Sequence, residues 1–109
     1  MAVEVRAARA EDEADCMALL GIATVSYNFA IRCGGEYAQL EELIVSAEAR
    51  GKNAGGLLVQ AAVSAARDRG CAEMGLYLLP STERNRPFYA KYGFAYVGSE
   101  LRQPLSSQS

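Results

Sequence analysis

The sequence predicts an α/β fold built on a mixed, partly antiparallel sheet, with the element order β-α-β-β-α-β-α-β. Two observations support this class: two β-rich segments flank a glycine turn, and segments with helical spacing alternate with short apolar runs. Half of the 109 residues are apolar, which is enough for one modest core. We therefore expect a single domain over residues 1–105, followed by a disordered tail over residues 106–109.

A strand and a helix are expected first. Residues 3–7 alternate apolar and polar side chains, which predicts a short strand. Residues 10–20 combine apolar side chains at helical spacing with acidic side chains near the start, where the helix dipole favours them. Gly21 can end this helix.

An antiparallel hairpin follows. Residues 24–32 are β-rich and place apolar side chains at alternate positions. Residues 33–36 (Cys-Gly-Gly-Glu) have the composition of a turn, and residues 37–45 supply a second strand.

A helix and a strand come after the hairpin. Residues 46–54 are expected to form a loop, and residues 55–68 have the spacing of a helix that Gly70 ends. Residues 71–79 then form a strand, which completes a β-α-β crossover.

The last elements are short. Pro80 ends the preceding strand, and residues 81–91 predict a helix that stops at Gly93. Residues 94–97 predict a final strand.

The net charge and the hydropathy of the sequence limit which classes of binding partner are expected. The net charge of −2 gives no general attraction to nucleic acid or to anionic lipid, so neither is expected as a partner. No apolar run approaches the ~20 residues that span a bilayer. The first fifteen residues lack the apolar core of a signal peptide, so we expect a cytoplasmic protein.

The ionisable residues limit the chemistry. The sequence has no histidine, which excludes Ser-His-Asp and Cys-His catalysis and argues against a catalytic metal site. Cys16, Cys33 and Cys71 are odd in number and widely spaced, so we expect free thiols in a reducing compartment and no metal. Acid–base chemistry would have to come from carboxylates, tyrosine, cysteine or lysine.

Residues 49–56 form a glycine-rich segment between a strand and a helix. Three glycines allow successive backbone N–H groups to turn toward one point at a helix N-terminus, where an anion is favoured. Arg50 and Lys52 add positive charge. The segment has neither the Walker A order nor the Rossmann order. It is therefore either a phosphate-binding loop or a plain glycine-rich connection with two solvated cations.

Two linked motifs resemble the GNAT acetyltransferase superfamily. Residues 40–52 (Leu-Glu-Glu-Leu-Ile-Val-Ser-Ala-Glu-Ala-Arg-Gly-Lys) are similar to its strand followed by an R-G-K-G-x-G loop. Residues 88–94 (Phe-Tyr-Ala-Lys-Tyr-Gly-Phe) are similar to its F-Y-x-x-x-G-F signature. The resemblance implies a GNAT-like fold and an acetyl-CoA-dependent N-acetyltransferase acting on a small-molecule amine.

The resemblance also implies how acetyl-CoA would be held. The loop amides would carry the pyrophosphate, and the end of the preceding strand would bond the pantetheine arm. An asparagine ahead of the second motif would add a contact. The implied cosubstrate-binding residues are Leu43, Ile44, Val45, Arg50, Gly51, Lys52, Asn53, Ala54, Gly55, Gly56 and Asn85.

Three residues are candidates for proton transfer. By resemblance, Tyr89 points at the CoA sulfur and would protonate the departing thiolate; the alternative is that Tyr89 only anchors its helix. The resemblance of this strand to polyamine-type acetyltransferases implies that Glu41 is the base for the amine, acting directly or through a water. Glu42 could serve instead, lie at the surface or pair with a cation. Strand geometry predicts that Glu41 and Glu42 point to opposite faces.

Two departures from the family pattern leave alternatives open. Asn53 stands where the loop usually has its first glycine; asparagine tolerates a positive φ, so the turn can survive. The region before the hairpin has one expected helix where the superfamily has two helices and a strand. A homodimer with a shared site, or a non-catalytic CoA-binding or dimeric interaction module, would also fit. The acceptor amine is not specified, although the Leu-Glu-Glu-Leu stretch resembles polyamine acetyltransferases.

Overall fold

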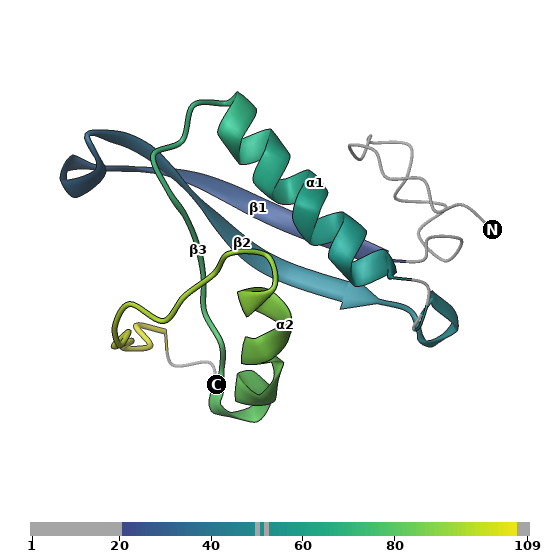
Figure 1. Cartoon of the computed structure of the whole chain (residues 1–109). Coiled ribbons are helices and arrows are strands. Elements are labelled where there is room, and N and C mark those ends of the chain that lie inside the picture. The colour runs from purple at the N-terminus through teal and green to yellow at the C-terminus, as the bar shows by residue number, and fades with distance from the viewer. Residues whose placement is uncertain (1–20, 50, 52, 107–109) are drawn as a thin grey trace. The chain divides into compact units, whose positions relative to one another are not determined.

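The computed structural model describes residues 21–49, 51 and 53–106. The strand predicted at residues 3–7 and the helix predicted at residues 10–20 lie outside these ranges. The chain divides into two compact units, Met1–Leu76 and Tyr77–Ser109. Figure 1 traces the helices and strands in chain order.

The first unit is organised around an antiparallel hairpin. β1 (Gly21–Ala30) and β2 (Gly35–Val45) are joined by a 3₁₀ turn at Ile31–Cys33. Gly34 closes this turn with a φ of 69°, a left-handed conformation that glycine adopts without steric cost. The predicted hairpin is confirmed. Its first strand begins at residue 21 rather than 24, because residues 21–23 pair with the end of β2.

A third strand makes the sheet mixed. β3 (Met74–Leu76) runs parallel to β2, and the order is β1-β2-β3. The parallel register covers only residues 38–40 of β2, so the strand is much shorter than the predicted 71–79. The ladder stops at Leu40, one residue before an irregularity in β2, and such irregularities interrupt strand pairing. The mixed α/β class is confirmed.

α1 (Ala54–Asp68) connects β2 to β3 and matches the helix predicted at residues 55–68. Its C-terminus is closed by two backbone bonds, from the Gly70 N–H to the Arg67 oxygen at 3.0 Å and from the Cys71 N–H to the Ala66 oxygen at 3.1 Å. Gly70 has a φ of 86°. These bonds form a Schellman motif, which explains why the helix ends at the predicted glycine.

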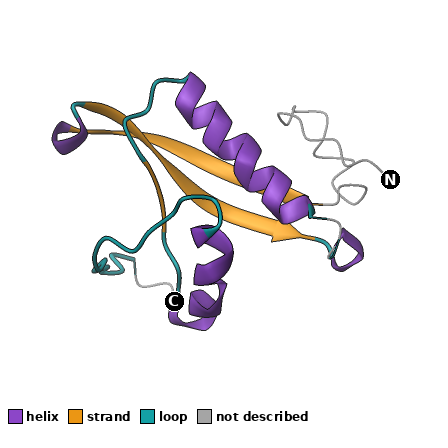
Figure 2. Cartoon of the chain, in the orientation of Figure 1, coloured by secondary structure: helices purple, strands orange, loops and turns teal. Residues whose placement is uncertain are grey.

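The core lies between α1 and the hairpin. α1 contacts both β1 and β2 and runs along one face of them (Figure 2). Val59, Ala62 and Ala66 of the helix are buried, as are Ala38 and Leu40 of β2. These side chains are small or branched, and their burial provides the hydrophobic contribution to the stability of this unit.

Gly21 allows the start of β1 to approach its neighbours closely. A Cβ at this position would lie 2.7 Å from the Ile44 carbonyl oxygen and 3.0 Å from Cδ1 of Leu58. Both distances are shorter than ordinary carbon contacts, so any side chain here would force the strand or the helix to move.

A polar contact fastens the C-terminal end of α1 to the hairpin. The Arg69 guanidinium donates from Nε to Glu36 Oε1 at 3.0 Å and from Nη2 to Glu36 Oε2 at 3.2 Å. The same guanidinium lies 4.1 Å from the centroid of the Tyr27 ring. Hydrogen bonding by Arg69 lowers the pKa of Glu36 below its usual value. The contact therefore favours the charged carboxylate.

The second unit contains a short helical segment. A 3₁₀ turn at Pro80–Asn85 leads into α2 (Arg86–Ala90), in place of the single helix predicted at residues 81–91. The break falls beside Pro87, which has no N–H to continue a helical bond ladder. Gly93, with a φ of 94°, ends the segment as predicted.

The strand predicted at residues 94–97 is wrong, since no strand is formed among the described residues of this unit. Local contacts account for the difference. The Phe94 N–H bonds the Tyr89 carbonyl oxygen at 3.3 Å, and Tyr96 takes the Arg86 guanidinium over its ring at 4.9 Å. Val97 is 97 % exposed. The alternating aromatics therefore pack back onto the helical segment instead of joining a ladder.

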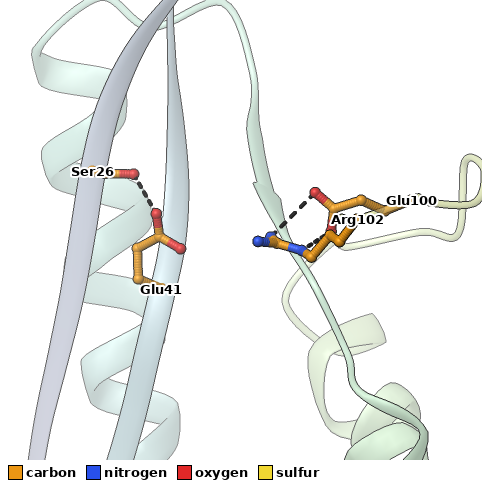
Figure 3. Close-up of polar contacts among 4 residues, drawn as sticks. All are labelled: Ser26, Glu41, Glu100 and Arg102. Atoms are coloured by element: carbon orange, nitrogen blue, oxygen red, sulfur yellow. Dashed lines mark hydrogen bonds and ion pairs between the residues drawn. The ribbon is translucent and has the colours of Figure 1, made fainter. Parts of the chain in front are cut away.

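Polar contacts also hold the C-terminal stretch of the second unit. Arg102 donates from Nε to Glu100 Oε2 and from Nη2 to Oε1, both at 3.2 Å (Figure 3). Its guanidinium lies 5.2 Å from the Tyr77 ring centroid. Among the described residues, no helix is both long and apolar enough to cross a bilayer.

Candidate active site

The turn before α1 has the geometry expected of an anion-binding loop. Asn53 adopts φ 59° and ψ 25°, in the left-handed region, as predicted for an asparagine in place of a glycine. Gly51 has a φ of 88°, and a Cβ there would meet no atom within 4 Å among the described residues beyond its chain neighbours. Arg50 and Lys52 lie outside the described residues.

The first turn of α1 carries backbone donors that precede the helical hydrogen-bond ladder. The first helical bond runs from the Leu57 N–H to the Asn53 oxygen at 3.1 Å, so the amides of Ala54, Gly55 and Gly56 precede the ladder. A helix N-terminus always leaves such N–H groups without intrahelical partners, and they favour an anion. The Asn53 side chain makes no capping bond to them. These residues therefore fit a phosphate group.

The end of β2 extends past its parallel partner. Pairing with β3 stops at Leu40, whereas β2 continues to Val45. The predicted pantetheine-binding residues, Leu43, Ile44 and Val45, lie in this stretch, and Ile44 is 57 % exposed. An unpaired strand edge can bond an extended, amide-bearing ligand by ordinary ladder geometry. The stretch leads directly toward the loop at the start of α1.

An extra residue in β2 changes the direction of its acidic side chains. Thr24 pairs with Glu42 while the next residue, Val25, pairs with Leu40, so Glu41 has no residue opposite. This is a β-bulge, which redirects side chains locally.

Two hydrogen bonds to β1 show where the carboxylates of Glu41 and Glu42 lie. Ser26 Oγ donates to Glu41 Oε2 at 2.7 Å, and Thr24 Oγ1 donates to Glu42 Oε1 at 3.0 Å. Thr24 and Ser26 are two residues apart on β1 and share a face, which is opposite to that of buried Leu40. Both carboxylates therefore reach the same face, away from α1. The prediction that they point to opposite faces is wrong, because it assumed an unbroken strand.

Tyr89 lies in α2, in the second unit. Its ring is half-buried and packs edge-to-face on Phe88 and Phe94, with centroid distances of 5.0 and 6.2 Å. Burial raises the pKa of Tyr89 above its usual value. The hydroxyl is therefore protonated at neutral pH, as a proton donor must be. Asn85, the predicted contact to CoA, is exposed at the end of the preceding 3₁₀ turn.

The structure brings some of the predicted residues together. Glu41, the end of β2 and the loop at the start of α1 belong to the first unit, while Tyr89 and Asn85 belong to the second. A centre that combines Glu41 with Tyr89 remains a prediction. Sequence reasoning missed Ser26 and Thr24. Their alternation on a strand opposite two glutamates was the available indication.

The chain therefore combines a mixed sheet that carries a bulged strand with a left-handed turn at a helix N-terminus, an α/β arrangement that fits an anion. The model of the acetyltransferase (GNAT) family matches residues 5–94, and the chain belongs to this family.

Relatives support the assignment. The chain is 37% identical over 78 residues to glucosamine 6-phosphate N-acetyltransferase 1 of Oryza sativa subsp. japonica, covering 72% of this chain and 45% of the relative. It is 34% identical over 71 residues to the probable glucosamine 6-phosphate N-acetyltransferase 2 of the same plant, covering 65% of this chain and 41% of the relative. The chain thus spans less than half the length of these curated relatives.

A solved structure agrees with the fold. The crystal structure of an acetyltransferase from Trypanosoma brucei superposes with a TM-score of 0.68 at 26% identity, covering 79% of this chain and 59% of that one.

Proposed function

We propose that the protein is an acetyl-CoA-dependent N-acetyltransferase that acetylates a primary amine of a small molecule. One observation carries the proposal: α1 begins at a left-handed Asn53 turn, and β2, which precedes that turn, continues to Val45 beyond the point where its pairing with β3 stops. In a member of the GNAT family, this arrangement fits the diphosphate and pantetheine parts of one cosubstrate.

The residues divide the binding of acetyl-CoA between them. The amides of residues 54–56 would bond the diphosphate, with Arg50 and Lys52 adding charge, and Gly51 and Asn53 shaping the turn. The backbone of residues 43–45 would bond the pantetheine arm. Asn85 would add a polar contact from the second unit.

The transfer needs two proton movements. The ammonium of the acceptor loses a proton to Glu41, directly or through a water, and the neutral amine attacks the thioester carbonyl. The C–S bond then breaks, and the departing CoA thiolate takes a proton from Tyr89. The nitrogen, which still carries one excess proton after the attack, releases it to the Tyr89 phenolate directly or through a water, so the amide product is neutral and the Tyr89 hydroxyl is restored. Exposure of Glu41 on the face of the hairpin opposite α1 is compatible with access by an amine. Glu42 is the alternative base.

The acceptor is proposed only as a class. The two rice relatives are named for an acceptor that carries a phosphate. Two exposed carboxylates on one face favour a cationic amine instead, because like charges repel a phosphate ester. Glucosamine 6-phosphate and spermidine are therefore the two informative acceptors.

Release of the CoA thiol from acetyl-CoA tests the proposal directly. The purified chain is mixed with each of a panel of amines, and free thiol is followed with a chromogenic reagent. Tyr89→Phe should lower the rate on the order of 10²-fold. Tyr92→Phe, in the same aromatic group, is the matched control and should keep the wild-type rate.

The controls separate the alternatives. No thiol release above the Tyr89→Phe background for any amine would count against transfer. If CoA still raised the melting temperature, a non-catalytic CoA-binding module would be favoured. The homodimer expected from the sequence remains a prediction, for which size-exclusion chromatography is the test.

A further inference from the structure

A chain of hydrogen bonds crosses the face of the hairpin opposite α1 and ends on Glu41. Asn28 Nδ2 donates to Ser26 Oγ at 3.2 Å, and Ser26 Oγ donates to Glu41 Oε2 at 2.7 Å (Figure 3 draws the second bond). Asn28 and Ser26 lie on β1, and Glu41 is the bulged residue of β2. The residues are thus linked across two strands rather than along one.

The number of protons and lone pairs on each side chain sets the direction of these hydrogen bonds. A serine hydroxyl has one proton and two lone pairs. The Asn28 amide occupies a lone pair of Ser26, so the single Ser26 proton is directed at the carboxylate. A bond of 2.7 Å to a carboxylate is typical of a strong, charge-assisted contact. Ser26 therefore holds one defined oxygen of Glu41.

We propose that Ser26 is a positioning residue for Glu41, an inference that rests on the proposed function. With Oε2 bound by Ser26, Oε1 is the oxygen that receives the proton of the acceptor amine. The bulge leaves Glu41 without a residue opposite, so no cross-strand partner fixes its side chain by packing. The Ser26 hydroxyl supplies that orientation instead.

The neighbouring pair provides a matched control. Thr24 Oγ1 makes the same kind of bond to Glu42 Oε1 at 3.0 Å, on the same two strands and the same face. Thr24→Val removes that hydroxyl and preserves the side-chain shape, as Ser26→Ala does at the next site. A general effect of losing a cross-strand hydrogen bond would appear in both variants.

Steady-state kinetics with an amine that the wild type acetylates is the test. Ser26→Ala should lower kcat on the order of tenfold, the value of one charge-assisted hydrogen bond, and leave the KM for acetyl-CoA unchanged. Ser26→Thr keeps the hydroxyl and should retain most of the activity. Thr24→Val should stay within about twofold of the wild type.

A double-mutant cycle separates positioning from structure. If Ser26 acts through Glu41, then Ser26→Ala in a Glu41→Gln background should cause no further loss, measured with radiolabelled acetyl-CoA for slow rates. An equal loss in both backgrounds overturns the proposal. So does an unchanged kcat in Ser26→Ala, or a loss in Ser26→Thr as large as in Ser26→Ala with intact melting.

The outcomes also distinguish the two levels of inference. A wild type that acetylates no amine overturns the proposed function, and the role of Ser26 with it. A wild type that is active, with Ser26→Ala equally active, overturns only the positioning role.

Discussion

Replacement of Asn53 tests the loop at the start of α1 most sharply. Asn53 holds φ 59° and ψ 25°, and its side chain makes no capping hydrogen bond. Substitution to alanine therefore changes the backbone preference and little else. An L-residue with a Cβ pays about 1–2 kcal/mol in the left-handed region, and asparagine pays the least of them.

The expected magnitudes follow from that preference. Asn53→Ala should lower the free energy of unfolding by about 1 kcal/mol, or the melting temperature by about 4–8 °C for a domain of this size. Asn53→Gly should stay within about 0.5 kcal/mol of the wild type, because relief at positive φ offsets the greater flexibility of the unfolded chain.

The same penalty should appear in cosubstrate binding. If the alanine loop relaxes out of the left-handed region, the binding-competent fraction falls, and the Kd for CoA rises about fivefold. Urea denaturation gives the stability of each variant, and calorimetric titration with CoA gives the affinity. Alanine and glycine variants that agree within about 0.3 kcal/mol in stability, and also in CoA affinity, would refute the conformational argument.

Three further predictions address packing, chemistry and pH. Gly21→Ala should destabilise the protein by about 1–3 kcal/mol in urea denaturation, because a Cβ at that position would lie too close to its neighbours. In the control Gly35→Ala the new Cβ meets no atom within 4 Å among the described residues beyond its chain neighbours, so the cost should stay below about 1 kcal/mol. Equal costs for the two variants would contradict the steric argument. Since burial raises the pKa of Tyr89, its hydroxyl should stay protonated from about pH 7 to about pH 9. The loss of acetyl-transfer rate in Tyr89→Phe, measured as a pH–rate profile, should therefore be the same at both pH values. A loss that vanishes by about pH 9 would contradict the role of Tyr89 as proton donor. Because Arg69 lowers the pKa of Glu36, the contact between them stabilises the fold at pH values above the unfolded pKa of about 4.3, and this stabilisation is lost as the pH falls through the folded pKa. The difference in free energy of unfolding between wild type and Glu36→Gln should therefore shrink from about pH 7 to about pH 3. A difference that stays constant over this range would exclude the ion pair as its source.

Local chemistry made several features readable from the sequence. Gly34 and Gly70 marked the turn of the hairpin and the end of α1, because only glycine adopts their positive φ freely. Asn53 was expected in the left-handed region because asparagine tolerates a positive φ better than other residues with a side chain, and its φ of 59° confirms this prediction. The loop and the helix start that form the cosubstrate half of the candidate site are contiguous in sequence, so their pattern is visible there.

The parts that sequence reasoning missed depend on pairing between distant residues. The bulge at Glu41 arises from the register of β1 against β2, and it turned a prediction of opposite faces into a shared face. Residues 94–97 have the alternating side-chain pattern of a strand, yet their aromatic side chains pack on the neighbouring helical segment. Alternation in the sequence predicts which side chains share a face only where the hydrogen-bond ladder is regular, without a bulge. It does not predict which other strand, if any, the segment pairs with.

The sequence by itself therefore determined the mixed α/β class, the bounds of α1 and the position of the left-handed turn before α1. Only the tertiary structure decided how the glutamates are presented and that Ser26 holds Glu41. The physical reason is the separation in sequence between the residues that interact. Turn and cap preferences act over a few residues, whereas Ser26 and Glu41 are 15 residues apart and meet only when β1 and β2 pair.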